Sequence, residues 1–522
     1  MTSYDEVPYT SYSYPQAHAD RLHVVASLFG ACPAPVDGAR VLELGCASGG
    51  NLLSAAELLP GSEFIGLDSS LGQLEVGREL AAEIELPNLE LRHADIMDVD
   101  ETWGMFDFII CHGVYSWVPP PVQDKILSIF RDRLRPQGVG YISYNVYPGW
   151  HLREMVRRMM RYHVREVEDP GTRVVQASAL IDFLSQNVSD TDGAYGVALR
   201  KELALLQTLP SDYLYHEHLE EQNQPIYFHE FADRLDARGL QYVGETDLRT
   251  MIVADLASEA AQTLQRIAPD LYAMEQYTDF LHNRQFRASV ICHRDITLKR
   301  ELRPPAADGL CFEFPGSLGE GPIDLAPEVN HTFIGPGEVR MNTASPITKA
   351  ALVHLRQAWP LALGVDELFG RASSLLAEAG IEVRPSDRDG LATDLLGCCF
   401  GGGLGVRSWV PPLATTVHER PRVTRTARAQ AKRADFVAGL HHQVVRLDRA
   451  QRHVVQRLDG ERDRQQLGDE LTQLVLDGEL DLTRDGTAIL DRDALREPLA
   501  HVLEQTLAAM LGQAMLLEPS SG

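Results

Sequence analysis

The sequence has 522 residues, too many for one ordinary hydrophobic core, so we expect about three domains. Its formal net charge of −26 makes nucleic acid an unfavourable partner. The negative charge would either attract a basic protein or serve only to keep the chain soluble. The seven scattered cysteines form no CxxC pair, so we expect neither a metal site nor disulfides. No apolar run could span a membrane, and the N-terminus has no signal-peptide pattern. We therefore expect a cytoplasmic protein without membrane insertion.

The first 150 residues alternate apolar strands with helices. An amphipathic helix is predicted over 16–30. Buried strands are predicted at 40–44, 64–67, 89–92, 106–111 and 139–144, with helices over 51–59, 71–85 and 121–134 between them. Because the strands are apolar on both faces, we predict an α/β fold whose parallel sheet is covered by helices on both sides.

The rest of the chain is predicted to be rich in helices. A mostly helical stretch comes first, and a helix over 228–238 precedes strands at 240–244 and 286–293. After a proline-rich break near residue 304, two sections each predict a helix, a turn and a second helix. This pattern favours one or two small winged-helix-like units in a mainly α C-terminal half. The Arg-, Thr- and Pro-rich segment 411–434 is predicted to be a linker.

The sequence ELGCASGGN, residues 43–51, lies between the first predicted strand and a helix. Glycine allows a sharp turn and a close approach of backbone to ligand, and the helix N–H groups can bind a polar group. A dinucleotide site would need glycine at position 47, where this chain has alanine, and the Glu-x-Gly start favours S-adenosylmethionine (SAM) over NAD. The loop residues predicted to bind the cofactor are Glu43, Gly45, Cys46, Ala47, Gly49 and Asn51.

Polar residues at the ends of the next strands complete the predicted cofactor site. Asp68, with Ser69 beside it, would accept hydrogen bonds from both ribose hydroxyls. Asp95 would accept from the adenine amino group, with Ile96 against the ring, and His112 follows the fourth strand. A glycine-rich turn alone would be weak support. Acidic residues at successive strand ends are stronger, because these ends meet at the edge where open α/β sheets bind ligands.

Four longer segments carry a family resemblance. They are YDEVPYTSYSYPQAHADRL (4–22), ICHGVYSWVP (110–119), ISYNVYPGWH (142–151) and YLYHEHLEEQNQPIYFHEF (213–231). With the cofactor motif, the chain resembles the class I SAM-dependent methyltransferases that carry a methyltransferase regulatory domain, a bacterial group that includes lysine methyltransferases of rickettsial outer-membrane proteins. The resemblance covers about residues 4–300 and is weaker over 305–522.

The resemblance implies an order of domains. A SAM-binding core would occupy 1–150, and 151–225 would be a helical insertion that serves as a dimerisation element. Residues 226–298 would hold the last helix and strands of the core and the regulatory segment. Winged-helix-like units of regulatory or substrate-binding type would follow at 305–410 and 436–522.

Side chains that follow the fourth and fifth strands are predicted to surround the methyl acceptor: Tyr115, Trp117, Asn145 and Tyr147. Aromatic ring faces attract a sulfonium or a methylated ammonium and exclude water. The tyrosine hydroxyls and the Asn145 amide oxygen would orient an amine. The alternative is that the aromatic residues serve only in packing.

Two other groups of residues, three N-terminal tyrosines and a His-Glu-His sequence, have no assigned role in catalysis. Tyr9, Tyr12 and Tyr14 form either a lid over the cofactor or an arm packed on the domain. The His-Glu-His sequence at 216–218 lacks the HExxH pattern of a zinc site, so we predict exposed charge there and no metal.

The favoured function is therefore methyl transfer from SAM to protein lysine side chains. The resemblance implies a protein substrate, for example an outer-membrane protein before export, and a homodimer. A small-molecule O-, N- or C-methyltransferase would share every cofactor residue. A SAM-binding regulatory protein without catalysis also stays open, because no general base is obvious in the sequence.

Overall fold

The structure is a computed structural model that describes residues 9–188, 193–208, 211–251, 258–481, 483–484, 487–488 and 491–519. Its centre is a seven-stranded sheet of order β3-β2-β1-β4-β5-β7-β6, in which β7 runs antiparallel to both neighbours. The strands are β1 (Arg40–Leu44), β2 (Glu63–Asp68), β3 (Leu89–His93), β4 (Phe106–Cys111), β5 (Leu134–Asn145), β6 (Leu240–Glu245) and β7 (Phe286–His293). The predicted α/β fold is confirmed, including the two late strands that complete the sheet.

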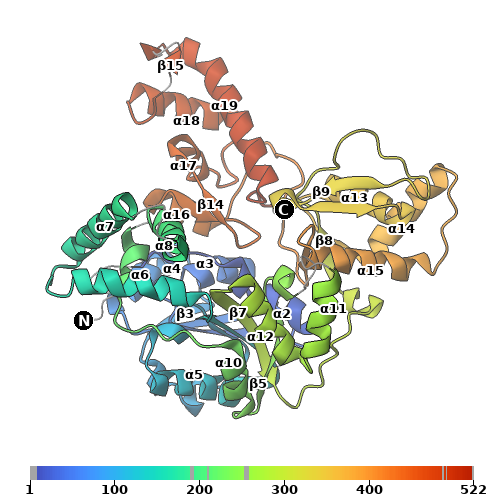
Figure 1. Ribbon diagram of the computed structural model, residues 1–522. Coiled ribbons are helices and arrows are strands. Elements are labelled where there is room, and N and C mark those ends of the chain that lie inside the picture. Colours follow the sequence, from blue (N-terminus) through green and yellow to red (C-terminus); the bar gives the residue numbers. More distant parts are fainter. Residues whose placement is uncertain are drawn as a thin grey trace.

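Helices cover both faces of this sheet (Figure 1). Neighbouring residues of β1 point to opposite layers, since Val41 packs in one core cluster and Leu42 in the other. One layer is formed by α2 (Ala19–Leu28), α3 (Gly50–Leu58) and α4 (Leu71–Glu83), and the other by α5 (Pro120–Arg133) and α10 (Phe228–Asp236). The apolar strand runs are therefore buried on both sides, as expected.

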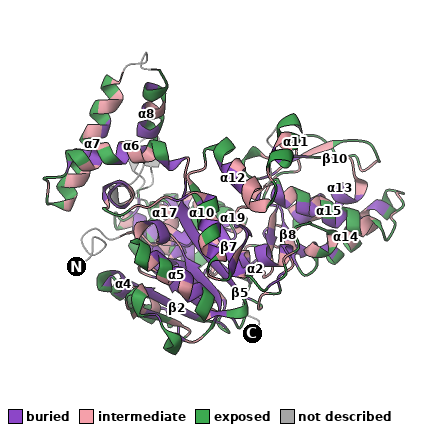
Figure 2. Ribbon diagram, turned by 60° about the horizontal axis from the view of Figure 1, so that its bottom comes forward, coloured by how far each residue is buried: buried purple, intermediate pink, exposed green. Residues whose placement is uncertain are grey.

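A helical insertion separates β5 from α10. It contains α6 (Trp150–His163), α7 (Pro170–Asn187), α8 (Gly193–Leu206), α9 (Ser211–Leu214) and a π-helical turn at Tyr215–Leu219. These helices pack on one another around a small core of their own that includes Met160, Ile181 and Leu203. Figure 2 shows α7 and α8 reaching away from the body, with much of their surface exposed.

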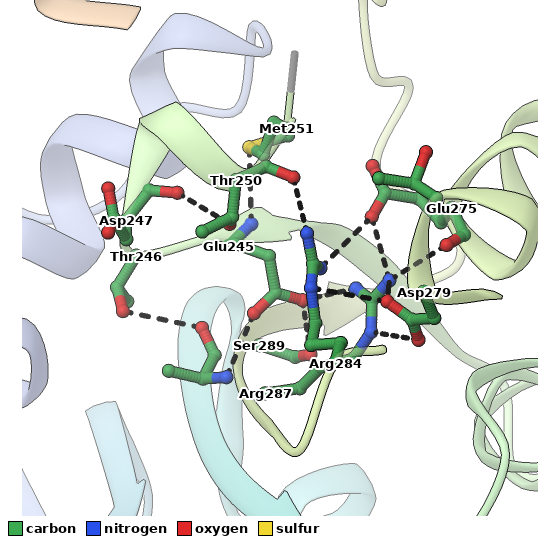
Figure 3. A network of polar contacts seen from close by, with 12 residues as sticks. Glu245, Thr246, Asp247, Thr250, Met251, Glu275, Asp279, Arg284, Arg287 and Ser289 are labelled. Carbon is green, nitrogen blue, oxygen red and sulfur yellow. Dashed lines mark hydrogen bonds and ion pairs between the residues drawn. The ribbon is translucent and has the colours of Figure 1, made fainter. Parts of the chain in front are cut away.

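The region that follows α10 is held together by a buried cluster of charges between β6, β7 and α12 (Leu271–His282) (Figure 3). Arg287 of β7 is 1% exposed. Its guanidinium donates to Glu245 at 2.7 Å, Glu275 at 3.0 Å and Asp279 at 2.8 Å, and Arg284 pairs with Asp279 at 3.2 Å. Burial lowers the pKa of Arg287, but the three carboxylates outweigh it and hold that pKa well above its usual value.

Helix α11 (Ser258–Ile267) lies between β6 and α12 in the sequence, and two further units follow β7. The middle unit has the three-stranded sheet β11-β8-β12 and the hairpin β9-β10. Its elements are β8 (Cys311–Glu313), β9 (His331–Ile334), β10 (Arg340–Thr343), α13 (Pro346–Ala358), β11 (Leu363–Gly364), α14 (Val365–Glu378), α15 (Asp387–Phe400) and β12 (Gly405–Arg407). The C-terminal unit has α16 (Arg425–Arg433), β13 (Phe436–Ala438), β14 (Val444–Arg446), α17 (Arg449–Val455), α18 (Arg464–Leu476), β15 (Thr483–Arg484), β16 (Thr487–Ala488) and α19 (Arg492–Gly512).

The expectation of a linker over 411–434 is wrong for its second half, which forms α16. Thr424 caps the helix by accepting from the N–H of Ala427 at 3.0 Å. The carboxylate of Glu57, on α3, accepts from the N–H groups of Arg425 at 2.7 Å and Thr426 at 2.8 Å. The C-terminal unit is therefore docked on the helices of the main sheet.

None of the helices in the described ranges is long and apolar enough to cross a bilayer.

Candidate active site

A cavity of about 280 Å³ opens at the carboxyl ends of the central parallel strands. Ten of the eleven predicted cofactor residues line it: Glu43, Gly45, Cys46, Ala47, Asn51, Asp68, Ser69, Asp95, Ile96 and His112. Gly49 does not line the cavity but caps α3 with a φ of +73°. The structure therefore brings together residues from the ends of β1, β2, β3 and β4.

The turn after β1 needs its glycines. Gly45 has a φ of +73°, and a Cβ atom there would lie 2.5 Å from Cγ2 of Val114. The N–H groups of Gly45 and Cys46 donate to the Leu67 carbonyl at 2.8 and 3.0 Å. Ala47 has a φ of +50°, which is unusual for a residue with a side chain, and its N–H donates to Asp68 Oδ2 at 2.8 Å.

Asp68 anchors this turn to the end of β2. Its Oδ2 accepts from Ala47, and its Oδ1 accepts from the N–H of Ser70 at 2.8 Å. Both carboxylate oxygens are thereby held in place at the mouth of the cavity.

Glu43 is a buried carboxyl group in the floor of the cavity, 3% exposed. Its Oε1 accepts from Nδ2 of Asn51 at 3.1 Å, whereas its Oε2 has no hydrogen-bond partner in the described part of the chain. Burial, together with the nearby Asp68, raises the pKa of Glu43 to about 8. A buried carboxyl with one unused oxygen suits a ligand that brings a cationic donor.

Asn51 connects the cofactor turn to the C-terminal unit. Its Oδ1 accepts from the N–H of Tyr14 at 3.0 Å and from Nε2 of His442 at 2.8 Å. Because an amide oxygen only accepts, this contact assigns a proton to Nε2 of His442, and Nδ1, 3.0 Å from Oγ of Ser54, can accept from that hydroxyl. Sequence reasoning missed His442, because no local pattern shows that a residue of the last quarter contacts α3.

The N-terminal segment forms the roof of the cavity. Ser11 Oγ accepts from the N–H of Gly50 at 2.9 Å, and the Tyr14 ring lies 4.0 Å from the ring of His112. Tyr9 and Tyr14 line the cavity, while Tyr12 packs on Phe436 at 4.6 Å. The segment is thus an arm packed on the domain, and two of its tyrosines also cover the cavity.

The predicted acceptor residues separate into two groups. Trp117 lines the cavity, but Tyr115, Asn145 and Tyr147 are not in its wall. The Tyr115 hydroxyl lies 3.3 Å from Arg234 in the buried layer below, Asn145 donates to Asn223 at 3.0 Å, and Tyr147 donates to Glu154 at 3.2 Å. A position directly after a strand therefore does not suffice to place a side chain in the cavity, since these three side chains point into neighbouring elements.

Part of the cavity wall comes from the His-Glu-His sequence. His216 and Glu217 line the cavity, and His216 and His218 are only 4% and 0% exposed. The prediction of exposed charge is therefore wrong for both histidines. The π-helical turn directs these polar side chains toward the interior. No apolar periodicity in the sequence could predict this burial.

The cavity wall is acidic and aromatic. Its carboxyl groups belong to Glu43, Asp68, Asp95 and Glu217, and none of the described lining residues is a lysine or an arginine. A wider, open cleft of about 1230 Å³ adjoins it and shares Tyr9 and Tyr14 with it. This cleft also touches the middle and C-terminal units through residues such as Trp359 and His441.

The sheet order, the glycine turn after β1 and the acidic residues at the ends of β2 and β3 define a class I SAM-dependent methyltransferase. Three family models agree with this class. A methyltransferase domain matches residues 41–138, a "predicted methyltransferase regulatory domain" matches 210–293, and a "PKMT, C-terminal winged helix domain" matches 419–515.

Similar proteins narrow the class to a family. The uncharacterised protein RP789 of Rickettsia prowazekii is 30% identical over 98% of this chain and 93% of its own length. The structure of PKMT2 from Rickettsia typhi superposes with a TM-score of 0.88 at 28% identity, covering 98% of this chain and all 100% of that one. PKMT2 in complex with AdoHcy, the demethylated form of SAM, gives a TM-score of 0.87 at 29% identity.

The chain belongs to the class I SAM-dependent methyltransferases that carry a methyltransferase regulatory domain and a C-terminal winged helix domain. Its cofactor is SAM, as expected from the Glu-x-Gly motif.

Proposed function

We propose that this enzyme transfers methyl groups from SAM to lysine side chains of proteins. The observation that carries the proposal is the cavity itself, whose described wall holds carboxyl groups and aromatic rings but no cationic side chain. Such a wall favours a cationic cofactor and a cationic acceptor, and it disfavours an anionic one. The similarity to PKMT2, whose name denotes a protein lysine methyltransferase, extends over nearly the whole chain and supports the same acceptor.

Different residues of the cavity fit the different parts of SAM. Asp68 would accept from the ribose hydroxyls, Ile96 and Val118 would pack on the adenine ring with Asp95 beside it, and Glu43 would face the amino group. SAM supplies a methyl group on a sulfonium: a nitrogen–carbon bond forms as the carbon–sulfur bond breaks, and the electron pair stays on sulfur. The enzyme must exclude water and hold the amine in line.

A protein substrate would use the wide cleft beside the cavity. Because Tyr9 and Tyr14 line both spaces, a lysine side chain of a polypeptide in the cleft would pass these two rings to reach the methyl group. An outer-membrane protein before export is the kind of partner that the family resemblance implies.

The deciding experiment uses methyl-labelled SAM, the purified chain and a bacterial lysate that includes the envelope fraction. Label in acid-precipitated protein, located on lysine by mass spectrometry, is the expected result. Label only in small molecules would replace the proposal with small-molecule methylation. SAM binding without label in either fraction would favour a regulatory protein without catalysis.

The affinity for AdoHcy is expected to fall as the pH drops from 8 to 6. The pKa of Glu43 is about 8 in the free protein, so the carboxyl is mostly protonated below that pH. An amino group at Oε2 favours the ionised form, so binding must release a proton, and affinity falls by up to about tenfold per pH unit. Calorimetry in buffers of different ionisation enthalpy measures this proton. Glu43→Gln should remove the pH dependence; a dependence that survives in this variant would contradict the assignment.

We also propose that the insertion forms a homodimer. Exposed apolar side chains gather on α7 and α8, among them Val175, Phe183, Tyr195 and Val197, exposed by 65, 59, 47 and 60%. Light scattering at micromolar concentration should give twice the mass of one chain, and Phe183→Glu with Val197→Glu should halve it. Val76→Glu, at an equally exposed position on α4, is the control. A monomeric unmodified chain would refute the dimer.

A further inference from the structure

The π-helical turn at Tyr215–Leu219 brings one carboxyl group into the wall of the cavity that the cofactor residues line. Glu217 lines the cavity and makes no hydrogen bond or ion pair with any residue in the described ranges. The two arginines nearest to it are engaged elsewhere. Arg153 donates to Glu202 at 2.9 Å, and Arg157 donates to the carbonyl of Glu220. Glu217 is thus a carboxyl group inside a cavity without a cation to pair with.

Two aromatic rings connect this carboxyl group to the strand ends. Tyr9 lies against His216, with 5.7 Å between ring centres, and it lines the same cavity as Tyr14. Tyr14 in turn lies against His112, at the end of β4. Glu217 and the cofactor residues therefore line one cavity, together with the rings of Tyr9 and Tyr14.

The other titratable groups of the wall are less suited to contact an acceptor. Asp68 is held by two backbone N–H groups and Glu43 by Asn51. Burial lowers the pKa of His112 to about 4, and its Nδ1 lies 2.8 Å from the Tyr141 hydroxyl, so it is a weak base. Asp95 lies beside Ile96, where the adenine ring is proposed to bind.

We propose that Glu217 binds the ammonium group of the acceptor amine and removes its proton before methyl transfer. This rests on the proposed function and deepens it, because it assigns the general base that is not obvious from the sequence. One proton moves from the ammonium nitrogen to a carboxylate oxygen of Glu217, which frees the lone pair for attack. The neutral amine keeps its two other protons and gains the positive charge with the methyl group as the sulfur loses it, and Glu217 later gives its proton to water.

The electrostatic setting agrees with this role. Burial raises the pKa of Glu217 to about 7, while Arg153, His216 and Arg157 act in the opposite direction. The group is therefore able both to accept and to release a proton near neutral pH. A lysine ammonium, with an ordinary pKa of about 10.4, loses its proton more readily once it leaves water and lies near a sulfonium.

Sinefungin tests the proposal without any protein substrate, because an amine-bearing carbon replaces the methylsulfonium of SAM in this compound. Calorimetry gives the affinity of the chain for sinefungin divided by that for AdoHcy, and groups that contact both ligands cancel in this ratio. The ratio should rise from pH 6 to pH 8. Glu217→Gln should lower it at pH 8 by about tenfold or more and make it independent of pH, with AdoHcy affinity unchanged. Glu217→Asp should restore part of it, and Glu221→Gln, at an exposed residue nearby, should change nothing.

An unchanged ratio in Glu217→Gln would overturn the proposal. So would a parallel loss of AdoHcy binding in both Glu217→Gln and Glu217→Asp, since that would make the residue structural. Failure of the unmodified chain to bind AdoHcy would overturn the proposed function and this inference together. A selective effect on sinefungin, combined with label in small amines instead of proteins, would uphold Glu217 as the base and reject only the protein substrate.

Discussion

Replacement of Arg287 by methionine is expected to lower the free energy of unfolding of the catalytic domain by about 3–5 kcal/mol. Arg287 is the group to which Glu245, Glu275 and Asp279 all bind (Figure 3). Without it, Glu275 and Asp279 keep only Arg284, and Glu245 loses its ion pair. The cost is that of burying unpaired charge. Because β7 lies between β5 and β6, we expect the edge of the sheet to open first. Urea unfolding followed by circular dichroism, with proteolysis to locate the opened segment, measures both effects.

Arg303→Met is the matched control for this prediction. Arg303 also pairs with a carboxylate, that of Glu301 at 2.6 Å, but the two side chains are 75 and 77% exposed. Exposed pairs contribute little, because water and salt screen them, so the urea midpoint should not change. Arg287→Lys should fall between the two variants, since it keeps the charge but loses the forked donors. Equal midpoints for Arg287→Met and Arg303→Met would show that the cluster does not stabilise the fold.

Asp68→Ala is expected to weaken SAM binding about 100-fold. The variant removes a carboxylate proposed to accept from two ribose hydroxyls, and each such hydrogen bond to a charged group contributes about 1.5 kcal/mol. It also removes the bond that holds Ala47 in its unusual backbone conformation. Calorimetric titration with SAM measures the change.

Asp100→Ala serves as the control for Asp68→Ala. Both aspartates accept from the N–H two residues further on, Asp68 from Ser70 at 2.8 Å and Asp100 from Thr102 at 3.0 Å. Asp100 is exposed and lies outside the cavity wall, so its variant should bind SAM normally. Undiminished SAM binding by Asp68→Ala would refute the placement of the ribose.

Most of the main sheet could be predicted from the sequence, because its information is local. Strand runs such as 40–44, 106–111 and 286–293 agree with the observed strands to the residue. The cofactor turn could be predicted for the same reason. A sharp turn between a buried strand and a helix limits the choice of residues, and acidic residues at successive strand ends must meet at one edge.

The parts that could not be predicted depend on contacts between distant segments. Helix α16 is rich in arginine and has few apolar residues, so it resembles a linker until Glu57 of α3 caps it. Glu217 looks like one charge among others in a polar run. Its place in the cavity depends on a π-helical turn and on the arm that carries Tyr9. Tyr115 follows a strand like a site residue, yet its side chain enters the layer beneath.

The bond between His442 and Asn51 has a consequence for the order in which the enzyme matures during synthesis. The two residues are 391 positions apart, so the ribosome must make most of the chain before the cofactor turn receives this donor. A nascent chain that has released only the main sheet holds the Asn51 amide with fewer bonds than the finished enzyme. The full capacity to methylate should therefore develop late, after the C-terminal unit has folded onto α3.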